Sequence, residues 1–571
     1  MKNFSRNAKW VLNTTNNDFV DYISKLSGLS STCAKVLINR GIKNQKQIDY
    51  FLKNNGSSFS DPMIIDGMSE SVGRIRDAIK KGERILISGD YDADGLTATA
   101  IMVECLKKLN ADIHYFIPHR FRNGYGFSNE AIEIAKQLVA RLIITVDSGI
   151  SSFDTLQQAK MLGFDVIITD HHEPVIDEEK GGFIIPDAYS IINPKLQADT
   201  KEPYNLKNLS GAGIAIKLAQ ALSEDQDFTD KLLDLAAIGT SADVVSVLGE
   251  NRLILDRGLK LIHDGLRPGI SALKDVSGFK NGYFKNSLLH FGLNPRINAP
   301  GRVDDAKDVI KLFFTKSYNE AQKIAKWMCD LNLKRQQIEE IVLKQAIEQV
   351  KSKETIDSAI VAASEKWHLG VIGIVASRLV DTFGVPSFIF TIDQGVAKGS
   401  ARSNGSFDLL EGLKKCAHLL ERFGGHKQAA GLSMKACLLD DFRKAINDVV
   451  LEAMPMDISP VISVDAILDF SDITQELVKE ISLFEPFGHC NSEPIFGAKL
   501  LEVLDARVVG NNHLLMNLKQ KGRIMNSIAF SMGDMVDIVN KGFVDVLFMP
   551  AIKKQYNNGI QLQVKALRLS N

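Results

Sequence analysis

Between residues 59 and 268, short runs of β-branched residues alternate with stretches of helical composition. The runs are "RILISGD" (84–90), "RLIITVDSG" (141–149), "FDVIITDHH" (164–172) and "YSIINP" (189–194). Strands that alternate with helices indicate βαβ units, and βαβ units build a parallel sheet. This alternation predicts an α/β domain with a parallel sheet over residues 59–268.

After residue 268 the pattern of apolar, polar and turn-forming residues changes several times. Residues 317–354 contain neither Gly nor Pro, which predicts one long helix or two abutting helices. A second α/β pattern follows, with "SAIVAAS", "GVIGIVASRLVDTF" and "PSFIFTID", and after it short strands alternate with turn signals. The predicted segments are a helical leader (1–58), the first α/β domain (59–268), a connecting segment with the long helix (269–354), a smaller α/β domain (355–455) and a β barrel (456–571).

Composition excludes several classes of protein. The 571 residues carry a net charge of −1, so nucleic-acid binding would have to come from local patches. Six cysteines without a CxxC pair argue against zinc fingers and disulfide frameworks and suit a reducing compartment. The first residues lack a signal-peptide core, and no apolar stretch reaches the roughly 18 residues of a membrane span. We expect a cytoplasmic protein without membrane contact.

Carboxylates and imidazoles follow four of the predicted elements directly. They are Asp90, Asp92 and Asp94 in "SGDYDADG", Asp147 in "VDSG", Asp170, His171 and His172 in "DHH", and Asp243 in "GTSADVV". In parallel α/β sheets, ligands bind outside the carboxyl ends of the strands. If the sheet is continuous, these side chains meet at one edge.

Carboxylates packed this closely repel one another and would bind protons unless cations neutralise them. Oxygen ligands joined by an imidazole suit Mn²⁺ or Mg²⁺, and the absence of cysteine ligands argues against structural zinc. Two such cations about 4 Å apart form a general device for in-line attack at phosphorus. The sequence therefore predicts a site for two divalent cations, Mn²⁺ or Mg²⁺.

Each motif alone has a simpler interpretation. A lone Asp-x-Asp-x-Asp run is often a solvated turn or a calcium loop, although the EF-hand spacing fails because Ile101 stands where the loop needs Glu. Asp147 alone would read as a helix cap, and Asp170 as a capping residue before two surface histidines. Their shared position at element boundaries favours a common site.

These motifs resemble the four motifs of the DHH phosphoesterase superfamily, and within it those of bacterial exonucleases specific for single-stranded DNA. The resemblance covers nearly the whole chain. Cys490 and Ser492 stand where these exonucleases usually have Gly and Pro, which concerns a turn and not the chemistry. Further matching stretches are "PHRFRNGYGFS" (118–128), "LSGAGIAIKLAQAL" (209–222), "NPRINAPGR" (294–302), "WHLGVIGIVASRL" (367–379), "KGSARS" (398–403), "FGGHKQAAG" (423–431) and "PFGHCNSEPIF" (486–496).

The resemblance implies a DHH-type catalytic domain with a parallel sheet, a long connecting helix, a smaller DHHA1-type α/β domain that binds nucleic acid, and a C-terminal OB-fold barrel. It implies a metal-dependent exonuclease that hydrolyses single-stranded DNA from 5′ to 3′, releases 5′-mononucleotides and acts in recombination and repair. It also implies work with single-strand-binding protein and a recombination helicase. We expect a monomer.

The resemblance also assigns roles to the clustered residues. Asp147 would bridge the two cations, and Asp90 would complete the first site or orient its water. Asp170 would fix an imidazole by a hydrogen bond, and His172 would face the scissile phosphate. The implied catalytic residues are Asp147, Asp170, His171 and His172, and the implied metal ligands are Asp90, Asp92, Asp94, Asp147, His171 and Asp243.

A second set of residues is expected to bind DNA. "NPRINAPGR" is predicted to be a loop that lines the site, and "KGSARS" a loop that cradles phosphate. Trp367 could stack on bases or lie in the core, and the Gly-Gly-His turn could instead cap a helix. The full set is Arg296, Asn298, Arg302, Trp367, His368, Ser400, Arg402, Ser403, Gly424, Gly425 and His426, with Lys398 beside it.

Two other functions fit part of the sequence. One is a DHH enzyme for short oligonucleotides, cyclic dinucleotides or phosphate monoesters, but such enzymes are typically shorter and lack a terminal β domain. The other is a nucleic-acid-binding protein with an inactive site, which is disfavoured because no metal-ligand position is substituted. A pyrophosphatase would leave the nucleic-acid-binding half without a purpose.

Overall fold

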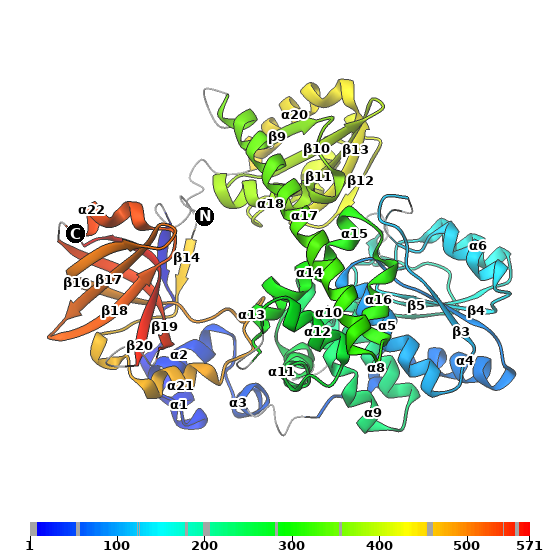
Figure 1. Ribbon diagram of the computed structural model, residues 1–571, viewed down its shortest axis with the longest axis horizontal. Coiled ribbons are helices and arrows are strands. Elements are labelled where there is room, and N and C mark those ends of the chain that lie inside the picture. The colour runs from blue at the N-terminus through cyan, green and yellow to red at the C-terminus, as the bar shows by residue number, and fades with distance from the viewer. Residues whose placement is uncertain are drawn as a thin grey trace. The chain divides into compact units, whose positions relative to one another are not determined.

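The computed structural model describes residues 8–52, 58–122, 124, 126–177, 181–197, 206–279, 284–352, 357–453, 461–540, 542–553 and 559–570. The chain divides into two compact units, whose helices and strands are labelled in Figure 1. One consists of Asn44–Lys334 with Phe484–Ser492, and the other of Met1–Lys43, Arg335–Leu483 and Glu493–Asn571.

The first unit contains the predicted parallel sheet. Its order is β3-β2-β4-β5-β8, and every neighbouring pair is parallel. Four strands coincide with the four predicted runs, whereas β3 is a half-buried edge strand outside them. The bounds are β2 (Ile85–Ser88), β3 (Ile113–Phe116), β4 (Leu142–Val146), β5 (Asp165–Thr169) and β8 (Ser190–Ile192), and a short hairpin of β6 (Val175–Ile176) and β7 (Phe183–Ile184) follows β5.

Helices cover both faces of this sheet, so the central strands β2 and β4 are buried over their whole length. Alternate residues of one strand face opposite layers: Ile144 packs in one core and Ile143 in the other. One face is covered by α4 (Met68–Lys81), α5 (Ala93–Lys108) and α8 (Gly211–Leu222), and the other by α6 (Asn129–Gln137) and α7 (Phe153–Met161).

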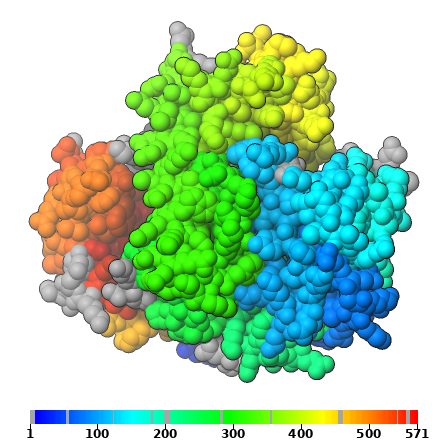
Figure 2. Space-filling view, turned by 45° about the vertical axis from the view of Figure 1, so that its right-hand side comes forward, coloured from blue at the N-terminus to red at the C-terminus, as the bar shows by residue number. Residues whose placement is uncertain are grey.

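The predicted connecting segment is only partly a connection. Residues up to Met328 pack into the core of the parallel sheet. Side chains such as Leu273 and Phe313 are fully buried in this core. Figure 2 shows the green surface of this helical region beside the blue surface of the same unit. The helices are α9 (Gln226–Lys231), α10 (Leu233–Ala242), α11 (Gly249–Asp264), α12 (Pro268–Val276), α13 (Asn286–Leu288), α14 (Asn294–Asn298), α15 (Pro300–Val303) and α16 (Ile310–Phe314).

The predicted long helix is a single helix of 34 residues, α17 (Tyr318–Lys351). Beyond it lies the smaller α/β domain, with sheet order β12-β13-β11-β10-β9, in which only β9 and β10 are parallel. Its elements are β9 (Ile360–Ser364), α18 (Leu369–Phe383), β10 (Ser387–Asp393), β11 (Val396–Arg402), α19 (Leu409–Lys415), β12 (Arg422–Gly425), β13 (Ala429–Lys435) and α20 (Leu439–Ala453).

The C-terminal strands form the predicted barrel. Five strands pair in the order β16-β17-β18-β20-β19, and pairing of β16 with β19 closes the sheet, which removes its free edges. The bounds are β14 (Val461–Val464), β15 (Ala466–Ile467), α21 (Gln475–Ser482), β16 (Phe496–Val509), β17 (His513–Gln520), β18 (Arg523–Ala529), α22 (Val536–Val539), β19 (Phe543–Ile552) and β20 (Ile560–Leu569).

The leader is not entirely helical, which corrects the prediction for residues 1–58. Helices α1 (Asn17–Ser27), α2 (Ser31–Asn39) and α3 (Gln45–Leu52) are present, but Lys9–Leu12 form strand β1. β1 pairs in parallel with β14, and Trp10 lies over the Arg568 guanidinium at 4.1 Å. A four-residue strand that depends on a partner far along the chain has little local signal.

Residues Phe484–Ser492 lie inside the predicted barrel domain but belong to the first unit. The buried Arg252 donates from Nη1 to Phe484 O at 2.8 Å, and Val247 N donates to His489 O at 2.8 Å. Cys490 has φ of 60°, a conformation that glycine adopts without strain, so the turn is kept although the glycine is not.

None of the helices in the described residues combines the length and the apolar character that crossing a bilayer requires.

A fully buried ion pair joins α8 to α11. Lys217 Nζ lies 3.0 Å from Glu250 Oε2, and both side chains are 0% exposed. Lys217 Nζ also donates to Ser60 O at 2.6 Å, while Ser60 N donates to Glu250 Oε1 at 2.6 Å. Removing one partner would leave the other charge buried without compensation.

We therefore expect Lys217→Met to lower the free energy of unfolding by about 3–5 kcal/mol, and Lys217→Met/Glu250→Gln to recover most of that loss. Urea unfolding measures both. Lys260→Met, which removes a pair between an exposed lysine and the half-buried Asp256, is the matched control and should cost under about 1 kcal/mol. A single variant as stable as its control would contradict the argument.

Candidate metal centre

The predicted acidic residues come together at the carboxyl edge of the parallel sheet. Asp147 directly follows β4, and Asp170 with the two histidines directly follows β5. Asp92 caps the N-terminus of α5, and Asp243 occupies the C-cap of α10. The site therefore draws on strand ends and helix ends from separate parts of the chain.

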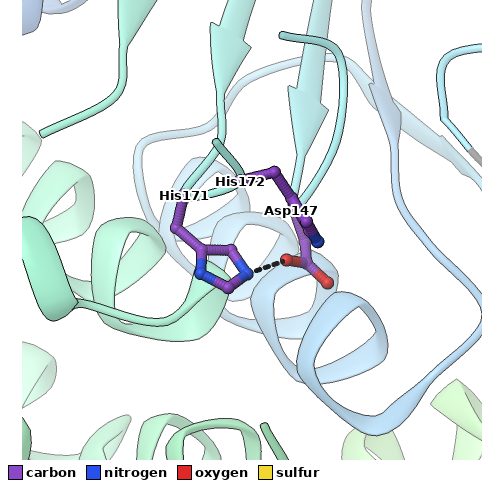
Figure 3. Close-up of side chains that lie close together, drawn as sticks. All are labelled: Asp147, His171 and His172. Carbon is purple, nitrogen blue, oxygen red and sulfur yellow. Dashed lines mark ion pairs between the residues drawn. The ribbon is translucent and has the colours of Figure 1, made fainter. Parts of the chain in front are cut away.

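His171 lies at the centre of this cluster. Its Nε2 is 3.1 Å from Asp147 Oδ1, 3.6 Å from Asp243 Oδ2 and 3.8 Å from Asp94 Oδ2. Figure 3 shows the His171 ring directed at the Asp147 carboxylate.

The ligand atoms form three groups, and the atoms of each group lie within 4.8 Å of one another. Asp147 belongs to two groups and His171 to two, so the groups describe adjacent positions with shared ligands. The groups are Asp90, Asp92 and Asp147; Asp94, His171 and Asp243; and Asp147, His171 and His172.

Helix N-termini hold two of the carboxylates. Gly211 N and Ala212 N, at the start of α8, donate to the Asp94 oxygens at 2.7 and 2.9 Å. Asp92 Oδ1 accepts from Asp94 N and Gly95 N, both at 3.1 Å. The positive ends of the two helix dipoles offset part of the repulsion between the negative charges.

The stretch "NPRINAPGR" is helical, which corrects the loop prediction. Its prolines stand in the first turns of α14 and α15, where a missing N–H costs no hydrogen bond. Asn298 Oδ1 accepts from Ala93 N at 2.7 Å, so this residue, predicted to contact DNA, fixes the start of α5. A Cβ at Gly301 would lie 2.9 Å from Tyr91 O, in the same loop.

Glycines leave the room that the carboxylates occupy. A Cβ at Gly211 would lie 2.4 Å from Asp147 Oδ1, and one at Gly239 would lie 2.4 Å from Asp94 Oδ1. A Cβ at Gly95 would lie 2.6 Å from the Asp90 Cβ, so Gly95 allows the start of α5 to lie close to Asp90. Asp147 itself has φ of 59°, a strained conformation typical of functional positions.

The protein alone does not stabilise these carboxylates in their charged form. Burial, followed by the charge of Asp92, raises the pKa of Asp90 to about 8, and burial with Asp243 and Asp92 raises the pKa of Asp94 to about 8. Burial and the neighbouring carboxylates raise the pKa of Asp147 well above its usual value. No donor among the described residues bonds Asp90 Oδ1. Divalent cations fit such a donor set.

Asp170 and His172 form a separate hydrogen-bonded pair. His172 Nδ1 lies 2.7 Å from Asp170 Oδ1, and Ile150 N donates to Asp170 Oδ2 at 2.9 Å. Burial opposes charge on both groups, but their hydrogen bond prevails: the pKa of His172 rises to about 9 and that of Asp170 falls to about 2. Burial lowers the pKa of His171 to about 4. His171 is therefore neutral, as a ligand must be, whereas His172 is a cation at neutral pH.

Three parts of the chain match known protein families, and the whole chain resembles known proteins. Family models match at residues 84–240 (DHH family, N-terminal domain), 357–452 (DHHA1 domain) and 464–566 (RecJ OB domain). The chain is 37% identical to the single-stranded-DNA-specific exonuclease RecJ of Bacillus subtilis over 94% of its length and 67% of that protein. It is 34% identical to RecJ of Salmonella typhimurium over 87% of its length and 88% of that protein.

The chain belongs to the RecJ family.

A solved structure agrees: the fold superposes on RecJ of Thermus thermophilus in complex with Mn²⁺ with a TM-score of 0.84 and 29% identity, over 99% of this chain and 80% of that one. The DHH, DHHA1 and OB domains expected from the motifs are therefore confirmed.

Two residues predicted to contact DNA, Trp367 and Ser403, are buried in the smaller α/β domain of this RecJ-family chain. Trp367 is 3% exposed and its Nε1 donates to Gln345 Oε1 at 2.8 Å, which supports the core alternative and not base stacking. Ser403 is 8% exposed and its hydroxyl donates to Phe407 O at 2.9 Å, closing a turn.

"KGSARS" is a strand and not the predicted loop. Residues 398–402 lie in β11. In this strand Ala397 and Ala401 are fully buried, and the polar residues between them face the other side. Arg402 donates from Nη1 to Ser400 Oγ at 3.1 Å, and a Cβ at Gly373, in α18, would lie 3.0 Å from the same oxygen. Lys398 is exposed on this strand.

The Gly-Gly-His stretch ends a strand and does not cap a helix. Gly424 and Gly425 close β12, and the exposed His426 follows in the turn to β13, with His426 N donating to Ala429 O at 2.8 Å. His368 caps α18, its Nδ1 accepting from Gly370 N at 3.1 Å. Arg296 and Arg302 are both half-buried in the first unit.

Sequence reasoning did not foresee how three positions shape the metal centre. Gly211 and Gly239 make room for the carboxylates, and Asn298 bonds the carboxylate loop. The pattern "LSGAG" predicts a helix that starts at Gly211, directly after a capping serine. Nothing in the sequence predicts that Gly211 lies against Asp147. The contact exists only because α8 lies beside the end of β4.

We expect Gly211→Ala to reduce nuclease activity by about 10- to 100-fold, because the new Cβ displaces the Asp147 carboxylate and weakens cation binding. Initial rates and calorimetric titration with Mn²⁺ measure this. Gly73→Ala on α4, where a Cβ meets nothing within 4 Å, is the control and should leave both unchanged. Equal activity of the two variants would contradict the role of Gly211.

The pKa shifts predict how the cation-free protein responds to pH. Between pH 6.5 and 8, Asp90, Asp94 and His172 hold protons that the unfolded chain releases, since their folded pKa values of about 8, 8 and 9 exceed the ordinary ones. The native state then binds more protons than the unfolded one, so the free energy of unfolding falls as pH rises.

Thermal unfolding in EDTA should therefore show a Tm that falls from pH 6.5 to pH 8. In Asp90→Asn/Asp94→Asn the fall should be shallower, because two of the titrating groups are gone. Mn²⁺ should raise the Tm of the unmodified protein more at pH 8 than at pH 6.5. Parallel slopes for the two proteins would contradict the pKa shifts.

Proposed function

We propose that this RecJ-family chain hydrolyses single-stranded DNA from 5′ to 3′ and releases 5′-mononucleotides with the help of two divalent cations, Mn²⁺ or Mg²⁺. The observation that carries the proposal is the set of buried ligand groups that share Asp147 and His171. The relatives named above are single-strand-specific exonucleases, and structures of the Thermus thermophilus protein contain Mn²⁺ or Mg²⁺.

The ligand groups suggest how two cations would be shared. Asp90, Asp92 and Asp147 would hold one, and Asp94, His171 and Asp243 the other, with Asp147 bridging. The 3.1 Å approach of Asp147 Oδ1 to His171 Nε2 supports a bridging position. When bound, divalent cations at these positions supply Lewis acidity at the phosphate and activate water for in-line attack.

The protein's own contribution is orientation and charge. Asp170 orients the His172 ring through the 2.7 Å contact between Asp170 Oδ1 and His172 Nδ1, and this contact raises the pKa of His172. His172 would face a phosphate oxygen, where negative charge accumulates in the transition state. The main-chain bonds to Asp94 and Asp92 fix two ligand carboxylates before the substrate arrives.

The remaining residues of the proposal guide the strand. The residues proposed to bind the DNA backbone are Arg296, Arg302, His368, Lys398, Ser400, Arg402, Gly424, Gly425 and His426. The closed barrel would follow the strand by stacking and charge, which explains binding without sequence preference. We further propose the five predicted segments, with Phe484–Ser492 assigned to the first unit. The protein would be a cytoplasmic monomer that acts in recombination and repair with single-strand-binding protein and a recombination helicase.

The test uses two 40-nucleotide single strands, one labelled at each end, and a blunt duplex, with Mn²⁺ or Mg²⁺. Labelled mononucleotide should leave the 5′-labelled strand from the first time point, while the 3′ label stays in shortening fragments. Asp147→Asn should lower the rate by about 100-fold or more, since it removes the shared ligand. Asp154→Asn, an exposed carboxylate on α7, is the control and should retain full activity.

Mononucleotides released first from the 3′ end would overturn the direction. If single strands persist while dinucleotides or cyclic dinucleotides are hydrolysed, the proposed metal centre is supported but the proposed substrate is wrong.

A further inference from the structure

A large apolar side chain stands in solvent beside the metal centre. Phe291 is 78% exposed, the highest fraction for any large hydrophobic side chain in the described part of the chain. Val244, which directly follows the ligand Asp243, is 71% exposed. Single exposed apolar side chains are common on proteins, so what distinguishes Phe291 is where it lies and how it is held.

The position of Phe291 is set by rigid structure. Residues Leu289–Leu293 form a π-helical turn, a feature frequent at functional sites, in which Asn294 N donates to Leu289 O. Leu289 and Leu293 are fully buried on either side of Phe291. A Cβ at Gly292 would lie 2.5 Å from the Phe279 ring, and Arg296 Nη1 donates to Gly292 O at 2.6 Å. The turn is thus anchored, and Phe291 is held outward.

The same turn is tied to the metal ligands. His290 Nδ1 lies 2.7 Å from Ser241 O, two residues before Asp243, and two residues span at most about 7 Å. The rings of His290 and Phe291 are in edge contact with centroids 4.7 Å apart. The helix after this turn carries Asn298, which bonds the start of α5. Residues 289–303 therefore touch both helices that carry ligands.

We propose that Phe291, with Val244 beside the same helix end, forms a stacking surface for one nucleobase of the single strand whose phosphate occupies the metal centre. The inference rests on the proposed function. An aromatic ring accepts any base because every base has a π-face, which fits an exonuclease without sequence preference. In a duplex, the faces of the bases are already stacked on their neighbours, so such a surface favours single strands.

The experiment measures the KM and kcat of the full-length protein on a 40-nucleotide single strand. Phe291→Ala should raise the KM about 5- to 100-fold with little change in kcat, whereas Phe291→Trp should keep the KM. Phe291→Leu, which is apolar but cannot stack, should resemble Phe291→Ala. Met161→Ala, which removes a 74% exposed side chain at the end of α7, is the control and should change nothing. Mn²⁺ titration should give the same affinity for all variants.

A second series uses strands in which one nucleotide near the 5′ end is abasic. For one position, loss of the base should raise the KM of the unmodified protein as much as Phe291→Ala does, and Phe291→Ala should not respond to that loss. An unchanged KM for Phe291→Ala or Phe291→Leu on intact strands would overturn the inference. The inference would also be overturned if Phe291→Ala changed the oligomeric state of the protein without changing the KM. Phe291 would then belong to a contact between two copies of the chain.

The two hypotheses fail in different ways. Unmodified protein that leaves single strands intact would overturn the proposed function and this inference with it. Unmodified protein that degrades single strands while Phe291→Ala matches it on every substrate would overturn the stacking surface alone.

Discussion

Repulsion among carboxylates buried at one edge of a parallel sheet is the constraint on which the rest of this structure depends. Asp90, Asp94 and Asp147 are all shielded from water, and burial raises the pKa of each. The protein offsets the repulsion only partly, through the N-terminus of α8 at Asp94. Since the remaining charge needs cations, the metal centre follows from how the carboxylates are buried.

The same constraint explains why small residues and a strained backbone surround the site. Gly211 and Gly239 stand where any side chain would collide with a carboxylate, and Asp147 adopts a positive φ. The helical segment 289–303 then braces the assembly from outside, through Asn298 at the start of α5 and His290 at the end of α10. The groups that position the ligands thus come from strand ends and helices far apart in sequence.

Much of the fold and of the site could be predicted because its signals are local. Apolar runs followed at once by acidic residues mark the ends of β2, β4 and β5, and a stretch without Gly or Pro marks α17. The failures also have physical causes. "NPRINAPGR" is helical because each proline falls in a first turn. "KGSARS" lies largely in a strand because Ala401, like Ala397 just before the motif, faces a core. Trp367 is buried by the packing of α17 and β9, which no local pattern reveals.

The sequence by itself determined the chemistry: which carboxylates and imidazoles exist, that they stand at element boundaries, and hence that divalent cations are their natural partners. Only the tertiary structure decided which of these groups lie close enough to hold the same cation, and that Asp170 and His172 form a hydrogen-bonded pair. It also decided that Asn298 bonds the carboxylate loop and that Phe291 faces solvent near Asp243. Periodicity and turn propensity act over a few residues, and a sequence displays them. Contacts between chain segments more than a hundred residues apart depend on how helices pack on the sheet, which is settled by the whole core at once.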